Sequence, residues 1–216
     1  LGMLGWSMPN GEEKFSIAEM ISHFDISRIS LGAPIFDVDK LRWLNGRWLR
    51  ETLTEEAFAD RLIEWAYNRE NLRKIIPLVK ERVDVFSELA PMISFFAEGM
   101  PDISEKSFEL KKLELNDVKK YLQFVLWRLE SQNDWHRDVL EEVFSELAKS
   151  LGIKIRELLG PVFIAFSGKS AAPPLFDSMA IVGPDLTRAR IRHALNILGG
   201  VSKKQAKSFE KEYRQL

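Results

Sequence analysis

The sequence contains no cysteine and only three histidines, His23, His136 and His193. Without cysteine, these 216 residues form neither disulfide bonds nor thiolate metal sites, and they offer no cysteine nucleophile. The wide separation of the histidines argues against a zinc site. No apolar run approaches the ~18 residues that a membrane-spanning helix needs, and no charged-then-apolar signal sequence opens the chain. We therefore expect a cytoplasmic protein without a metal site or a membrane contact.

Charge of one sign does not dominate the chain. Its 31 lysines and arginines face 32 aspartates and glutamates, which gives a formal net charge of -1. This balance excludes a uniformly basic coat, so any contact with RNA has to come from local patches. Residues 186–216 form one such patch, a basic tail with two acidic residues and eight basic ones. The basic residues are Arg188, Arg190, Arg192, Lys203, Lys204, Lys207, Lys211 and Arg214.

No catalytic motif is complete. The string SGKS at 167–170 matches the end of a phosphate-binding loop, but that loop needs a glycine five places before Gly168, where this chain has Phe163. We interpret SGKS as a turn between two helices. His136 has no nucleophile and orienting group beside it, so we expect it at the surface or at a helix cap. The residues alone therefore indicate no active site.

Apolar residues recur at helical spacing along most of the chain, and strand patterns are scarce. Ser16 and Glu19 form a capping box for a short helix, and Asp37 and Thr54 can cap the next two. Further helices are expected at about 71–80 and 82–97, from Asn116, from Asp134 to Gly152, before Gly183, and from about Thr187 to Leu198. We predict an all-α fold of packed helices with boundaries near residues 53 and 105.

The segment KLRWLNGRWLR, residues 40–50, combines four cations with two tryptophans. On a helix, Lys40, Trp43 and Arg47 lie on one stripe at spacings of three and four. Cations for phosphates and an aromatic plane for a sugar or base suit contact with RNA. The alternative, which the residues alone favour, places Trp43 and Trp48 in the core with the cations as a solvated rim.

Two other places suit RNA contact. The guanidinium of Arg82 can read a base edge through two parallel hydrogen bonds, although an ordinary surface charge is the simpler interpretation. In the loop 167–176, Pro173 and Pro174 restrict the backbone and Lys169 adds charge. Rigid loops between helices are suitable places to receive an unstacked base.

Four strings, in this order, carry a resemblance to a known family. They are LGMLGW at 1–6, SRISLGAPIFDVDKLRWLNGRWLRE at 27–51, QNDWH at 132–136 and PVFIAFSGKSAAPPLFDSMAIVG at 161–183. Over residues 1–198 the chain is similar to the C-terminal half of bacterial glutamyl-tRNA synthetases, and F-D-x-x-K-L-x-W-L-N-G is the most specific string. The family's catalytic domain carries HIGH and KMSKS-type signatures, which are absent here, and the chain does not begin with methionine. We therefore expect a part of a longer enzyme that is inactive alone.

The resemblance implies an all-α anticodon-binding region preceded by a short stem-contact segment. The expected parts are the stem-contact segment at 1–53, a helical anticodon-binding subdomain at 54–105, and a second one at 106–216 that includes the basic tail. It also implies that Lys40, Trp43 and Arg47 touch the tRNA, which favours the RNA interpretation of that helix over the core interpretation.

The resemblance further implies roles in anticodon recognition. Arg82 matches the arginine that recognises the third anticodon base, and its presence favours an enzyme that rejects glutamine tRNA. The residues expected around the first two bases are Phe163, Pro173, Leu175 and Phe176. The family's P-[LI]-R-x-A-x-T-G string has arginine and threonine where this chain has Phe163 and Ser167. Stacking on an aromatic ring, worth ~1–3 kcal/mol per base, can replace part of the arginine's contribution with less base specificity.

By the same resemblance, the longer protein is an ATP-dependent ligase that joins glutamate to its tRNA. ATP and Mg²⁺ belong to the catalytic domain, and no cofactor is expected in this chain. The expected partners are glutamate tRNA and the protein's own catalytic domain, without DNA or membrane, and the expected state is a monomer. The tail from Gly200 onward is either a phosphate-binding arm or a solubilising end. The alternative function is a helical protein-interaction scaffold without RNA binding, which the near-neutral charge motivates.

Overall fold

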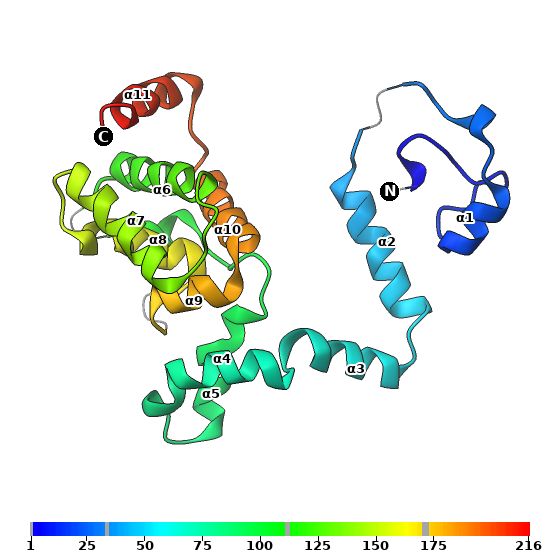
Figure 1. Cartoon of the computed structure of the whole chain (residues 1–216), viewed down its shortest axis with the longest axis horizontal. Helices are drawn as coiled ribbons and strands as arrows, with labels where there is room; N and C mark the ends of the chain where they lie inside the picture. The colour runs from blue at the N-terminus through cyan, green and yellow to red at the C-terminus, as the bar shows by residue number, and fades with distance from the viewer. Residues whose placement is uncertain (1, 33–34, 111–112, 170–172) are drawn as a thin grey trace. The chain divides into compact units, whose positions relative to one another are not determined.

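The computed structural model describes residues 2–32, 35–110, 113–169 and 173–216. Every regular element among these residues is helical, and no strand occurs among them, so the prediction of an all-α fold is confirmed. The chain divides into two compact units, residues 1–64 and 65–216 (Figure 1). In the described ranges, no helix is long and apolar enough to cross a membrane. The three-part division at 53 and 105 stays a prediction.

In its described residues, the first unit contains three α-helices, whose starts follow from local capping, and two 3-10 turns, η1 (Gly2–Leu4) and η2 (Ile26–Arg28). The α-helices are α1 (Ile17–His23), α2 (Val38–Glu51) and most of α3 (Glu55–Ala66). The capping box of α1 is reciprocal, because Ser16 Oγ accepts from the Glu19 amide at 3.2 Å and the Glu19 carboxylate accepts from the Ser16 amide at 2.7 Å. The Asp37 carboxylate accepts from the Lys40 amide at 2.9 Å, and Thr54 Oγ1 caps α3. All three predicted caps are confirmed.

The first unit buries little apolar surface. In its described residues, the buried apolar side chains are Trp6 and Met8, and α1, α2 and α3 contribute none. Trp6 packs against the ring edge of Phe15 and against Phe24, with centroid separations of 6.0 and 6.1 Å. Large apolar side chains that stay exposed in this unit include Ile17, Ile21, Ile26, Leu31, Ile35, Trp43, Trp48, Phe58 and Ile63.

The second unit contains the remaining helices. They are α4 (Arg69–Val79), α5 (Phe86–Ile93), α6 (Leu115–Glu130), α7 (Arg137–Ser150), α8 (Ile155–Ser167), α9 (Leu175–Val182), α10 (Pro184–Ile197) and α11 (Lys203–Tyr213). Three 3-10 turns accompany them, η3 (Lys80–Arg82), η4 (Ser94–Phe96) and η5 (Glu105–Phe108).

Several predicted helix starts in the second unit were wrong by a few residues, including that of α5, which begins at Phe86 rather than at about residue 82. Helix α6 begins after Glu114 rather than at Asn116, and α7 begins after His136 rather than at Asp134. Neither N-cap residue, Glu114 or His136, makes a side-chain hydrogen bond to the helix. The prediction relied only on the polar character of Asn116 and Asp134 and therefore placed both helix starts wrongly. Helix α10 begins at Pro184, where the fixed backbone angle of proline suits the first helical position.

Two apolar clusters organise the second unit. The larger one fills the space among α6, α7, α8, α9 and α10, with Leu122, Phe144, Leu158, Met179 and Ile191 almost fully buried. The smaller one contains Ile75, Val79 and Ile93, against which Ile181 of α9 packs. We call α4, η3, α5 and η4 the α4–α5 lobe, and α6 to α11 the body. Figure 1 shows the lobe beside α9, which contacts both α4 and η4.

The chain after Gly200 contains a helix, α11, for which the sequence predicts no element. Ser202 and Gln205 form a reciprocal capping box at the start of α11. Phe209 is 4% exposed and packs against the edge of Phe124. Tyr213 lies 5.0 Å from the Trp127 ring centroid. Helix α11 therefore packs on the body.

Candidate nucleic-acid interface

Helix α2 presents the predicted stripe of Lys40, Trp43 and Arg47. The guanidinium carbon of Arg47 lies 5.2 Å from the centre of the Trp43 ring, in cation–π contact. Trp43 is 46% exposed and Trp48 is 48% exposed, so neither tryptophan belongs to a core in this chain. The stripe therefore offers an aromatic face with a cation beside it.

Surface carboxylates pair with the cations of this stripe. Lys40 donates to Glu13 at 2.5 Å, and Arg47 donates to both carboxylate oxygens of Glu51, at 2.8 and 3.0 Å. The hydrogen bonds from Arg47, and then the one from Lys14, lower the pKa of Glu51 to about 2. Glu51 is thus an anion at neutral pH. Exposed ion pairs contribute only ~0–1 kcal/mol, so an incoming phosphate can compete for Arg47.

Arg82 ends η3, the turn that joins α4 to α5. It is exposed in the α4–α5 lobe. The following turn is held by the Asp84 amide, which donates to the Glu88 carboxylate at 2.9 Å. The backbone of Arg82 therefore belongs to a short connection between two helices.

The four residues expected around the first two anticodon bases occupy different environments. Phe163 is half-buried on α8 and lines a shallow hollow of about 400 Å³ with Leu110, Ile155, Arg156, Leu159, Gly160 and Ile164. Pro173 is buried, and Leu175 at the start of α9 is 5% exposed. Phe176 is half-buried and packs against the edge of Phe144, with centroids 5.4 Å apart. Residues 170–172 of the predicted loop lie outside the described residues.

The turn after α8 is the one that the SGKS string predicts. Gly168 has φ +69°, a left-handed conformation that glycine adopts without strain, and its amide donates to Ile164. The next residue, Lys169, extends to the α4–α5 lobe. Its ammonium donates to the Pro91 carbonyl and, at 3.1 Å, to Ser94 Oγ.

Arg190, one of the basic residues of the segment 186–216, is buried and donates hydrogen bonds to backbone carbonyls. It is 1% exposed, and burial lowers its pKa from the ordinary arginine value. Its Nε donates to Gly99 and its Nη1 to Phe166, both at 2.9 Å. Its Nη2 donates to the carbonyls of Phe95 and Glu98, both at 2.6 Å.

Arg188 and Arg192 are also engaged with the body. Arg188 donates to the carbonyls of Leu129 and Gln132 at the end of α6. Arg192 pairs with Glu130 at 2.7 Å. All three arginines therefore have partners within the body, and Arg190, which is 1% exposed, is not accessible to an RNA. The count of charges in the sequence could not show this, because the partners, backbone carbonyls for Arg188 and Arg190 and the Glu130 carboxylate for Arg192, lie far away in the chain.

No group of three or more His, Asp or Glu side chains could hold a metal ion within the ranges that the structure describes. The chemistry on offer there is recognition by guanidinium groups, ammonium groups and aromatic faces. Such groups suit contact with the phosphates and bases of an RNA.

Comparison with known proteins points the same way. Residues 57–195 match the family described as "Anticodon binding domain". All 216 residues align at 52% identity with the glutamate–tRNA ligase of Marinomonas sp. (strain MWYL1), and also with that of Alcanivorax borkumensis. In both cases the chain spans 44% of the relative's length.

A solved structure extends the likeness to the fold. It is a crystal structure of a glutamate tRNA ligase from Elizabethkingia meningosepticum in complex with its amino acid. The two chains are 25% identical with a TM-score of 0.55, and the match covers 91% of this chain and 39% of that one.

Proposed function

This chain belongs to the anticodon-binding domain family, and on that basis we propose that it is the part of a glutamate–tRNA ligase that recognises glutamate tRNA. The observation that carries the proposal is the alignment of every residue of the chain with the C-terminal part of ligases at 52% identity. Within the longer protein, its task is to bind the tRNA and hold it in place while glutamate is joined to the 3′ end.

The stripe on α2 is proposed as the contact with the tRNA stem. Trp43 offers a face on which a sugar or base can pack, and Arg47 beside it can bind a phosphate. Binding would exchange the Arg47–Glu51 pair for an Arg47–phosphate pair. Lys40 would exchange its pairing with Glu13 in the same way. Since both pairs are exposed, the exchange requires little free energy.

The anticodon is proposed to bind the second unit. Arg82 would recognise the third anticodon base through two parallel hydrogen bonds. Phe163, half-exposed beside the hollow on α8, would provide a stacking face for another base. Pro173, Leu175 and Phe176 would shape the receiving wall, with Leu175 anchoring it in the core.

The activity of the longer protein is proposed to be ATP-dependent ligation of glutamate to its tRNA. ATP and Mg²⁺ would bind in the catalytic part, and the residues of this chain bind and orient the RNA. The catalytic part is then the chain's protein partner. We further propose a cytoplasmic monomer.

The apolar side chains exposed on the first unit are the observation that favours the second candidate, a protein-interaction scaffold. Salt dependence separates the two functions. Binding that is dominated by phosphates weakens steeply as salt rises, whereas an apolar protein contact does not.

The test measures binding of the chain to glutamate tRNA, beside a copy with altered anticodon bases, at two salt concentrations. We expect salt-sensitive binding that drops when the anticodon is altered. Binding to neither RNA would contradict the proposal for this chain and favour the scaffold. Equal binding to both RNAs would mean that the anticodon is not what the chain recognises.

A further inference from the structure

Two cations cross from the body to the end of the α4–α5 lobe. Arg190 of α10 donates to the carbonyls of Phe95, Glu98 and Gly99, which follow α5, and to Phe166 in the last turn of α8. These carbonyls lie at or just beyond helix ends, where backbone acceptors lack partners within a helix. The partial negative charge of helix C-termini favours a cation at such places. Arg190 thus joins three elements through hydrogen bonds to backbone carbonyls.

Lys169 makes the second crossing from a different element. It leaves the turn after α8 and donates to the carbonyl of Pro91 and the hydroxyl of Ser94. Its ammonium also lies 5.9 Å from the centre of the Phe95 ring. Both cations therefore end on one short stretch, residues 91–99.

We call the contacts between the α4–α5 lobe and the body the joint. Its apolar contacts are less directional than the hydrogen bonds from Arg190 and Lys169. The small cluster of the lobe receives Ile181 from α9, and Phe95 meets the edge of Phe166 with centroids 5.8 Å apart. Burial of apolar surface favours contact between the lobe and the body but does not fix the angle between them. The guanidinium group of Arg190, with hydrogen bonds to four carbonyls, does fix this angle, because each hydrogen bond has a preferred direction.

We propose that Lys169 and Arg190 are positioning residues for anticodon binding. They hold the α4–α5 lobe, which carries Arg82, at a fixed spacing from the α8–α9 surface, which carries Phe163. One anticodon can then engage both surfaces at once. This inference rests on the proposed function and adds to it the device that couples the two ends of the site.

The coupling has a measurable signature. When two binding surfaces are held at the right spacing, the second contact forms with a high effective concentration. Loosening the joint lowers the affinity for an RNA that engages both surfaces. It leaves unchanged the affinity for an RNA that has already lost its contact with one of them.

The experiment compares the unchanged chain with Lys169→Met, using glutamate tRNA and a copy altered at the third anticodon base. We expect Lys169→Met to weaken binding of glutamate tRNA by roughly five- to tenfold. We expect a change of less than about twofold for the altered copy. Lys169→Arg, which keeps a donor in place, should restore most of the loss.

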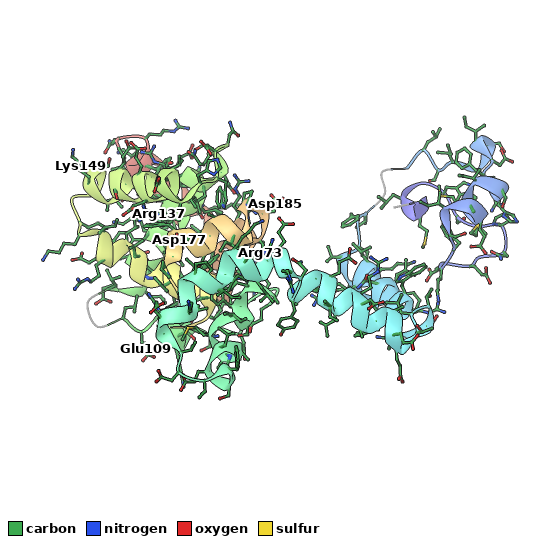
Figure 2. The ribbon with its side chains drawn as sticks, turned by 60° about the horizontal axis from the view of Figure 1, so that its bottom comes forward. Arg73, Glu109, Arg137, Lys149, Asp177 and Asp185 are labelled. Carbon is green, nitrogen blue, oxygen red and sulfur yellow. The ribbon has the colours of Figure 1, made fainter. Side chains whose placement is uncertain are left out.

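Lys149→Met is the matched control, since it also removes one surface lysine charge. Lys149 lies at the end of α7, exposed, and Figure 2 shows it pointing outward from the body. This variant should leave binding of both RNAs unchanged. Circular dichroism should report the same helix content and the same unfolding for all three variants.

Several outcomes overturn the inference. An equal loss on both RNAs would mean that Lys169 acts on the fold or on general charge, and no loss on either would mean that the joint does not matter for binding. Arg190→Lys provides a second test, and it should show the same difference between the two RNAs. If the unchanged chain fails to distinguish the two RNAs, the proposed function itself fails, and the inference fails with it.

Discussion

Replacing Arg190 with methionine should destabilise the second unit far more than the same change at Arg192, two positions along α10. Arg190 is 1% exposed and donates hydrogen bonds to four carbonyls. Arg192 is half-exposed and makes a single ion pair with Glu130. The two variants remove the same charge from the same helix, so the comparison isolates the buried bonds.

The expected size of the effect follows from these bonds. The bonds to Phe95 and Phe166 are fully buried, and a bond from a charged donor contributes about 1.5–3 kcal/mol. The bonds to Glu98 and Gly99 are partly open, so water can replace the guanidinium there. Removing a buried cation returns some of this loss. We expect Arg190→Met to lower the free energy of unfolding by about 3 kcal/mol, and Arg192→Met by less than about 1 kcal/mol.

Urea unfolding followed by far-ultraviolet circular dichroism measures both values, with the slope of the transition checked for each variant. A loss below about 1 kcal/mol for Arg190→Met would contradict the reasoning. An equal loss for the two variants would do so as well, since it would assign the effect to net charge.

Three further predictions concern the proposed site and the tail. Arg82→Gln should cost about 1–3 kcal/mol of discrimination at the third anticodon base in tRNA-binding assays, with the fold intact; an equal loss on every tRNA would exclude the base contact. Glu51→Gln should free Arg47 and strengthen tRNA binding by about two- to fivefold in low salt, and weaker binding would show that Glu51 instead orients the cation. Phe209→Ala should lower the free energy of unfolding by about 3–5 kcal/mol, because this ring is buried against Phe124; an unchanged transition would mean that α11 adds nothing to the body.

The sequence predicts the fold class and the early helix starts well because both depend on local patterns. Ser16, Asp37 and Thr54 each cap a helix through an amide at most three residues away. Asn116 and Asp134 have the right chemistry for caps, but neighbouring residues take that position. A polar residue near a helix start is thus a weaker signal than a reciprocal capping box.

The candidate site is harder to predict because it depends on partners that are distant in the chain. The donors on Arg190 and Lys169 find acceptors 24 to 95 positions away in the chain, and no spacing rule reveals that. The stripe on α2 was predictable, since its members share one helix face. The exposure of Trp43 was not predictable, because a tryptophan buried in a core would stand at the same spacing in the sequence.

The thin core of residues 1–64 has a kinetic consequence for the proposed stem contact. With Trp6 and Met8 as the buried apolar side chains of its described part, little free energy opposes local opening of α2. Amide hydrogens of α2 should exchange with solvent much sooner than those of α6. RNA that settles on Trp43 would have to pay for ordering this helix, which weakens the contact. A tRNA held by this contact alone would therefore dissociate quickly. A tRNA whose anticodon also binds the second unit would remain bound for longer.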